Sequence, residues 1–264
     1  MGDKSSIEWT EATWNPTTGC DRISPGCDNC YALTLSKRLK AMGQPKYQND
    51  GDPRTSGPGF RLTLHDDAVS IPLAWREPRV IFVNSMSDLF HQDVPLGFIR
   101  RVFDVMAATP QHTYQVLTKR SKRLAQLADK LDWPANIWMG VSVETNRYAF
   151  RADHLRDVPA AVRFLSVEPL IGAVPSLDFT DMDWVIVGGE SGHGARPLEI
   201  DWVLDVHERS TAAGAAFFLK QLGTVWAREN GYRGKAHHMD EWPEDLRMRA
   251  MPADVAPIGE LVAT

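Results

Sequence analysis

The chain has 264 residues, of which 43% are hydrophobic and 24% charged, a composition typical of a folded protein with a sizeable core. Its formal net charge of −5 excludes a global positive field that would draw it to nucleic acid, and leaves only a local basic patch open. No apolar run approaches the roughly 20 residues of a membrane helix, and the first residues contain no apolar stretch. We therefore expect a cytoplasmic protein with no signal peptide and no membrane partner.

Short apolar runs alternate with longer amphipathic stretches along the chain. The runs are rich in β-branched and aromatic residues and alternate little, which is typical of strands covered on both faces. Seven are predicted to be strands: residues 7–14, 79–84, 114–118, 137–143, 162–167, 184–187 and 216–219. Five stretches between them are predicted to be helices: residues 31–42, 97–109, 121–131, 147–156 and 201–213. The alternation predicts an α/β fold, a partial or irregular TIM-like (β/α) barrel of about six to seven parallel strands.

Two segments interrupt this pattern within what we interpret as a single domain over residues 1–264. Residues 44–59 are rich in Gly, Pro, Asn and Asp, which predicts a surface loop or insertion. The tail after about residue 248 is expected to be weakly structured.

All three cysteines of the chain, Cys20, Cys27 and Cys30, lie within eleven residues. Three thiols in one short loop favour a metal centre over a disulfide framework, which would leave one thiol over. A closed zinc site needs a fourth ligand, whereas three thiolates can hold a 4Fe–4S cluster with one iron open to a cofactor or substrate. Three histidines are candidates for a fourth zinc ligand, none with zinc-finger spacing: His193, His237 and His238. An iron–sulfur cluster is favoured, with zinc and no metal as the alternatives.

Charged residues follow the carboxyl ends of most predicted strands. In a parallel α/β fold these ends lie on one face, where such folds place their sites, and the cysteine loop follows the first strand onto the same face. We interpret Glu144, Glu168 and Lys220, at the ends of three predicted strands, as candidate catalytic residues. The ionised carboxylates of Glu144 and Glu168 can also accept hydrogen bonds from groups such as ribose hydroxyls. The alternative is that Glu144 and Glu168 only form ion pairs with Lys119 or Lys220 in the barrel mouth.

Residues 119–123, Lys-Arg-Ser-Lys-Arg, are the densest basic run and lie at a predicted strand–helix junction. The run can bind phosphate from a nucleotide or nucleic acid, or it can be a solvated helix start. No aromatic residues alternate with the basic ones, so the pattern does not reinforce nucleic-acid binding.

A strand, a three-cysteine loop and a helix beginning Tyr31-Ala32, at the start of a parallel α/β fold, resemble the radical S-adenosylmethionine superfamily over about residues 7–221. The resemblance implies that Cys20, Cys27 and Cys30 hold a 4Fe–4S cluster, that S-adenosylmethionine binds its open iron, and that a reductant supplies an electron. The implied reaction is homolytic cleavage of the cofactor's carbon–sulfur bond, followed by hydrogen abstraction from a substrate that the sequence does not identify.

Three segments more closely resemble a family of proteins of unknown function that is common in phages and prophages: residues 19–32, 84–91 and 218–221. This resemblance implies a phage-associated protein, and by association a nucleic-acid-related substrate.

The chain departs from the superfamily in three respects. The cysteine spacing is C-x6-C-x2-C instead of C-x3-C-x2-C, and Asn29 replaces the aromatic residue before the third cysteine. The Gly-Gly-Glu segment that binds the cofactor's amino group normally ends the second strand, but here it follows the sixth. The residues after the second strand are therefore candidates as well. The candidate cofactor-binding residues are Ser85, Ser87, Asp88, Gly188, Gly189 and Glu190.

The competing function is a non-enzymatic module, stabilised by zinc or a closed cluster, that binds a protein or nucleic acid for a phage or mobile element. It predicts no affinity for S-adenosylmethionine. The strand-end carboxylates count against it, because a structural metal does not need them. A third interpretation is an iron–sulfur enzyme that uses the open iron as a Lewis acid without radical chemistry, which the sequence does not separate from the first.

Overall fold

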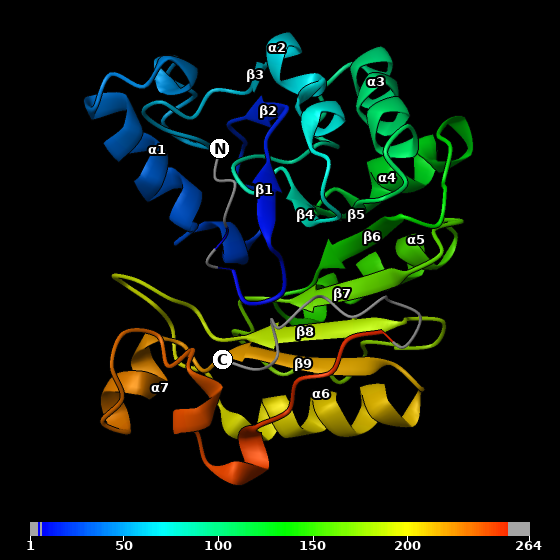
Figure 1. The fold of residues 1–264 in the computed structure, drawn as a ribbon. Coiled ribbons are helices and arrows are strands. Elements are labelled where there is room, and N and C mark those ends of the chain that lie inside the picture. Colours follow the sequence, from blue (N-terminus) through cyan, green and yellow to red (C-terminus); the bar gives the residue numbers. More distant parts are fainter. Residues whose placement is uncertain (1–4, 6, 253–264) are drawn as a thin grey trace.

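One curled sheet dominates the computed structural model, which describes residue 5 and residues 7–252 (Figure 1). Seven parallel strands follow chain order across this sheet, with β1 and β9 at its two edges. They are β1 (Ala12–Trp14), β4 (Val80–Val83), β5 (Thr113–Thr118), β6 (Ile137–Ser142), β7 (Arg163–Val167), β8 (Trp184–Gly188) and β9 (Ala216–Gln221). The sheet is a half-barrel flanked by helices, which confirms the predicted partial TIM-like fold. The short strands β2 (Thr17–Thr18) and β3 (Thr63–Leu64) form a separate antiparallel pair.

Helices follow most strands, and those after the later strands flank the outside of the sheet, whereas the first helix lies near the strand ends beside the cavity (Figure 1). The longer ones are α1 (Tyr31–Ala41), α3 (Leu96–Ala107), α4 (Ser121–Leu127), α5 (Phe150–Arg156) and α6 (Ile200–Ala212), and the short ones are α2 (Asp66–Val69) and α7 (Thr224–Glu229). In α3 the residues Ile99, Val102, Phe103 and Met106 are buried at helical spacing, so one face of the helix joins the main core. None of the helices in the described residues is long and apolar enough to cross a membrane.

The first strand is shorter than predicted and covers residues 12–14 instead of 7–14. Residues 7–10 form a turn, and the Thr10 hydroxyl donates to the carbonyl oxygen of Val80 at 3.0 Å. Trp9, which made this segment resemble a strand, packs edge-on against Phe82 and Trp184. The segment thus fills the half-barrel and does not extend its edge.

Two predicted helices are also shorter than expected. The stretch predicted over residues 121–131 ends as an α-helix at Leu127 and continues as a 3-10 turn over 128–130. The stretch predicted over 147–156 begins with a 3-10 turn over 146–148, and α5 starts only at Phe150.

The concave face carries an aromatic layer toward the amino ends of the strands. Its buried members come from the N-terminal turn and from alternate positions of five strands: Trp9, Phe82, Trp138, Phe164, Trp184, Ile186 and Phe218. Gly140 lies among them, and a Cβ there would be 2.4 Å from the Phe164 ring. This layer closes the bottom of the half-barrel, so the open space lies at the carboxyl ends.

The two irregular segments both pack on the domain. Residues 44–59 lie against the cysteine loop, where Arg22 N donates to Thr55 O at 2.7 Å. Residues 248–250, which we expected to be weakly structured, run along β9: Leu219 N donates to Met248 O and Ala250 N to Phe217 O, both at 2.8 Å. An edge strand has unpaired backbone groups, and this segment satisfies them. The rest of the expected tail, from residue 253, lies outside the described residues.

Candidate functional site

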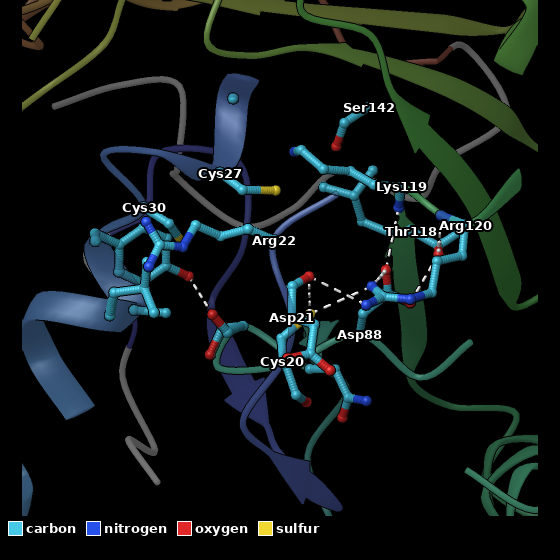
Figure 2. A pocket seen from close by; sticks show the side chains of 18 of the residues that line it. Cys20, Asp21, Arg22, Cys27, Cys30, Asp88, Thr118, Lys119, Arg120 and Ser142 are labelled. Carbon is cyan, nitrogen blue, oxygen red and sulfur yellow. Dashed lines mark hydrogen bonds and ion pairs between the residues drawn. The ribbon is translucent and has the colours of Figure 1, made fainter. Parts of the chain in front are cut away.

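The three cysteines line one cavity of about 160 Å³ at the carboxyl ends of β4, β5 and β6 (Figure 2). All three are free thiols and are half-buried. The cysteine loop and the start of α1 form one wall, including Gly26, Tyr31 and Ala32. The opposite wall consists of residues on or after the three strands, including Asn84, Ser85, Ser87, Asp88, Thr118, Lys119, Arg120 and Ser142.

No group of three or more His, Cys, Asp or Glu side chains in the described part of the chain is arranged to hold a single metal ion. A tetrahedral zinc site with Zn–S bonds of about 2.3 Å would bring its sulfur atoms to within about 3.8 Å of one another. The three thiols therefore surround a shared space without converging on one point in it.

Cys20 is held from the β5 side by Arg120. The Arg120 Nη1 atom donates to Cys20 Sγ at 3.3 Å and to Asp88 Oδ2 at 3.0 Å, while Nη2 donates to the Asp21 carbonyl at 3.1 Å (Figure 2). Burial raises the pKa of Cys20 to about 12, and the Arg120 guanidinium opposes this shift.

Asp88, a predicted cofactor-binding residue, has its carboxylate occupied by protein donors. Besides Arg120, it accepts from the Thr118 hydroxyl at 2.7 Å, from Phe90 N at 2.9 Å and from Lys119 N at 3.2 Å. These contacts fix the Asp88 carboxylate, which in turn orients Arg120.

Glu144 is completely buried and fastens the middle of the cysteine loop to the end of β6. Its carboxylate accepts from the Ser24 hydroxyl at 2.5 Å and from Arg151 Nη1 at 3.0 Å, and lies 3.5 Å from Lys119 Nζ. Burial raises the pKa of this carboxyl, but Lys119, Arg151 and Ser24 outweigh it and hold the pKa below its ordinary value. A Cβ on Gly26 would be 2.4 Å from Glu144 Cγ, so the loop passes the glutamate as closely as only glycine permits.

Glu190 fastens the same loop from the end of β8. It accepts from Asn29 Nδ2 at 3.0 Å and from Arg196 Nε at 2.8 Å, and Arg196 Nη2 also donates to the Pro25 carbonyl at 2.8 Å. Burial raises the pKa of Glu190, but the hydrogen bonds from Arg196 and Asn29 outweigh it, so the pKa is lowered. Glu190 is thus engaged with the cysteine loop instead of being free for a cofactor.

Close packing explains why the two residues before Glu190 are glycines. A Cβ on Gly189 would lie 2.5 Å from the Leu222 carbonyl oxygen, and one on Gly188 would lie 2.9 Å from Glu168 Oε2. The Gly-Gly-Glu segment is therefore required by close backbone passage and loop anchoring.

The serines after β4 are also engaged within the protein. Ser87 Oγ donates to the Thr17 carbonyl at 2.9 Å, and the Ser85 carbonyl accepts from the Tyr31 hydroxyl. Ser85 Oγ accepts from Asn15 Nδ2 at 3.1 Å.

Asn84 is the residue at this strand end that the sequence interpretation missed. It lines the cavity, is 3% exposed and has a left-handed backbone with φ of 62°. Its Nδ2 donates to Thr17 Oγ1 at 2.9 Å, whereas its buried Oδ1 has no hydrogen-bond partner among the described residues. An asparagine directly after an apolar strand was the available signal, because Asn tolerates this backbone conformation.

Glu168 and Lys220 form a separate pair across the ends of β7 and β9. Lys220 Nζ lies 2.9 Å from Glu168 Oε2 and 5.9 Å from the centroid of the Trp9 ring. Burial disfavours the ammonium, but the carboxylates of Glu168 and Glu8 outweigh it and raise the pKa of Lys220.

The basic run over residues 119–123 is mostly turned into the protein. Lys119 and Arg120 bind the carboxylates of Glu144 and Asp88, and Arg123 Nη2 donates to the Val94 carbonyl at 2.6 Å. Lys122 is the exposed member of the run. Most of the run's cationic groups are thus engaged with protein acceptors around the site.

Comparison with curated proteins and with solved structures found no match. A family described as protein of unknown function (DUF5131) matches residues 4–252, which is nearly the whole chain. This chain therefore belongs to the DUF5131 family, which confirms the prediction that it is a member of a family of unknown function.

Proposed function

We propose that this protein is an iron–sulfur enzyme of the radical S-adenosylmethionine type. In this proposal Cys20, Cys27 and Cys30 each bind a different iron of a 4Fe–4S cluster, and the fourth iron binds S-adenosylmethionine. The observation that carries it is that three free thiols line one cavity at the open carboxyl end of a parallel half-barrel.

The donor set fits a cluster better than a single ion. Thiols that surround a space without converging suit a group whose ligands attach to separate metal atoms. A closed zinc site would need three or more ligands that converge, and no such group exists in the described residues. This argument favours the enzyme over the zinc-stabilised binding module.

The cavity also contains an unused acceptor for a ligand. Asn84 Oδ1 is buried and unpartnered within the described residues, and it requires a donor such as an amino group or hydroxyl. Ser85, Ser87, Asp88 and Glu190 are engaged with protein partners, so Asn84 replaces them in our assignment of the cofactor contact.

The chain's own residues have distinct roles in this proposal. A bound and reduced cluster with S-adenosylmethionine would supply reductive cleavage of the cofactor's carbon–sulfur bond and, through it, hydrogen abstraction from the substrate. Phe82 and Leu117 provide an apolar floor that excludes water from the cavity. Lys220, charged because Glu168 and Glu8 stabilise it, holds a proton at the concave face, and Glu168 keeps it in position.

A reducing compartment fits the three unpaired thiols, because disulfides form where thiols are oxidised. We therefore expect a cytoplasmic protein whose partners include a reductant for the cluster. The resemblance to phage-encoded proteins makes a nucleic-acid-related molecule the first substrate class to test.

The test is anaerobic reconstitution of the full chain with iron and sulfide, followed by metal analysis and electron paramagnetic resonance with and without S-adenosylmethionine. We expect about four irons per chain and a spectrum that changes when the cofactor is added. Cys20→Ala, Cys27→Ala and Cys30→Ala should each lose iron. Ser142→Ala is the matched control, because Ser142 lines the cavity without a thiol and should leave iron content unchanged.

Two results would reject the proposal. Full iron content in all three cysteine variants would exclude the cysteines as ligands. Bound zinc, or a cluster whose spectrum ignores S-adenosylmethionine, would favour the binding module or a cluster that does no radical chemistry.

A further inference from the structure

The three cysteines are not equivalent in their surroundings. Cys20 Sγ accepts a hydrogen bond from the Arg120 guanidinium at 3.3 Å. The hydrogen bond recorded for Cys27 Sγ is with the neutral Ser24 hydroxyl, at 3.8 Å. Within the described residues, Cys20 is thus the only one of the three whose sulfur contacts a cationic donor.

Arg120 is held in place from the protein side. Its side chain is 11% exposed, and it donates to Asp88 Oδ2 at 3.0 Å and to the Asp21 carbonyl at 3.1 Å. Asp88 is itself fixed by Thr118, and the Asp21 carboxylate lies 2.9 Å from His91 Nε2. The guanidinium is therefore pre-organised toward the sulfur and needs no rearrangement to contact a thiolate there.

We propose that Arg120 is a positioning residue that raises the reduction potential of the cluster through its hydrogen bond to Cys20, an inference that rests on the proposed function. Reduction adds one negative charge to the cluster and its thiolates. A charge-assisted donor on a ligand sulfur stabilises that added charge more than it stabilises the oxidised form. Asp88 offsets part of the arginine's charge, but the N–H donor remains directed at the sulfur.

The guanidinium geometry matters beyond its charge. Arg120 contacts Cys20, Asp88 and the Asp21 carbonyl at once through two nitrogens. A lysine has a single flexible ammonium and cannot reproduce this fork. Arg120→Lys should therefore retain the charge but lose part of the effect on the potential.

The experiment is a redox titration of the reconstituted full-length protein, monitored by electron paramagnetic resonance. We expect Arg120→Gln to keep the iron content of the unchanged protein and to shift the midpoint potential to a more negative value, with a smaller negative shift in Arg120→Lys. The control is Arg123→Gln, because Arg123 lies in the first turn of the helix that follows Arg120, but its hydrogen bonds go to the Gln92 and Val94 carbonyls. Its potential should not move.

The outcomes separate this inference from the proposed function. If the unchanged protein binds no iron, the proposed function is rejected. If both Arg120 variants bind the cluster and have the midpoint potential of the unchanged protein, only the role of Arg120 is rejected. If Arg120→Gln does not bind the cluster, the midpoint potential of Arg120→Lys tests the inference instead. Loss of iron in both Arg120 variants, with normal iron content in Arg123→Gln, would mean that Arg120 is needed for the structure of the cysteine loop. That result also overturns the inference about the reduction potential.

Discussion

Glu144 and Glu168 follow neighbouring strands of one sheet, yet they have different environments. Glu144 is fully buried and holds three partners, one of which comes from the cysteine loop. The Glu168 side chain is 14% exposed, and among the described residues its cationic partner is Lys220, on β9. The same position after a strand thus produces an anchor of the cysteine loop in one case and an ion pair across the sheet in the other.

Glu190 belongs with Glu144. Each carboxylate is neutralised by an arginine and accepts from a side chain of the cysteine loop, Ser24 in one case and Asn29 in the other. The loop itself contains only a 3-10 turn over residues 25–27. Charged strand ends therefore supply the rigidity that the loop's own backbone does not.

The largest expected effect is that of Glu144→Ala. It leaves Arg151 and Lys119 without their carboxylate in the interior, so we expect the free energy of unfolding to fall by about 3–5 kcal/mol. Urea denaturation measures this loss. The control is Asp153→Ala, which breaks the exposed pair with Arg156 and should cost less than about 1 kcal/mol. Equal losses in the two variants would contradict the anchor role of Glu144.

Gly26→Ala tests the same anchor from the loop side. The added Cβ would meet Glu144 Cγ at 2.4 Å, so the loop must shift, at a cost of about 1–3 kcal/mol and with less iron bound after reconstitution. Gly97→Ala is the matched control, because a Cβ there meets nothing within 4 Å. Normal iron content in Gly26→Ala would show that the cysteines tolerate a displaced loop.

Glu168→Gln should sharpen the contrast. It removes the charge partner of a largely buried lysine, which we expect to lower the free energy of unfolding by about 1–2 kcal/mol. Because the recorded partners of Glu168, Lys220 and Ser166, lie outside the cysteine loop, iron content should not change while turnover of S-adenosylmethionine falls. Loss of iron would assign Glu168 to the anchors instead.

The smallest expected effect is in the pH dependence of stability. The pKa of Glu190 is lowered in the folded protein. The ionised carboxylate therefore adds to the free energy of unfolding above its ordinary pKa of 4.5, and this addition is lost as the pH falls through the folded pKa. Glu190→Gln should therefore lose less stability than the unchanged protein when urea midpoints are compared at pH 6 and pH 4. Glu77→Gln, at an exposed glutamate, is the control. An unchanged difference between the two pH values in Glu190→Gln would exclude this contribution.

The strands were predictable where both faces are apolar, as in β6 and β8, since every residue of these strands is buried. Prediction failed at residues 7–11, because Trp9 is equally suited to a strand and to filling the concave face. Residues 248 and 250, at the start of the predicted weakly structured tail, hydrogen-bond to β9, about 30 residues earlier, and their own composition does not indicate this.

The sequence by itself determined the parallel α/β architecture, the single cysteine loop and the common face on which the charged strand ends lie, because strand spacing and residue type are local properties. Only the tertiary structure decided which of those charges pair with one another and which of them hold the cysteine loop. Ser24 and Glu144 are 120 positions apart, and Asn29 and Glu190 are 161 apart. A hydrogen bond depends on atoms meeting within about 3 Å, and side chains this far apart in the chain acquire that geometry only when the sheet has formed.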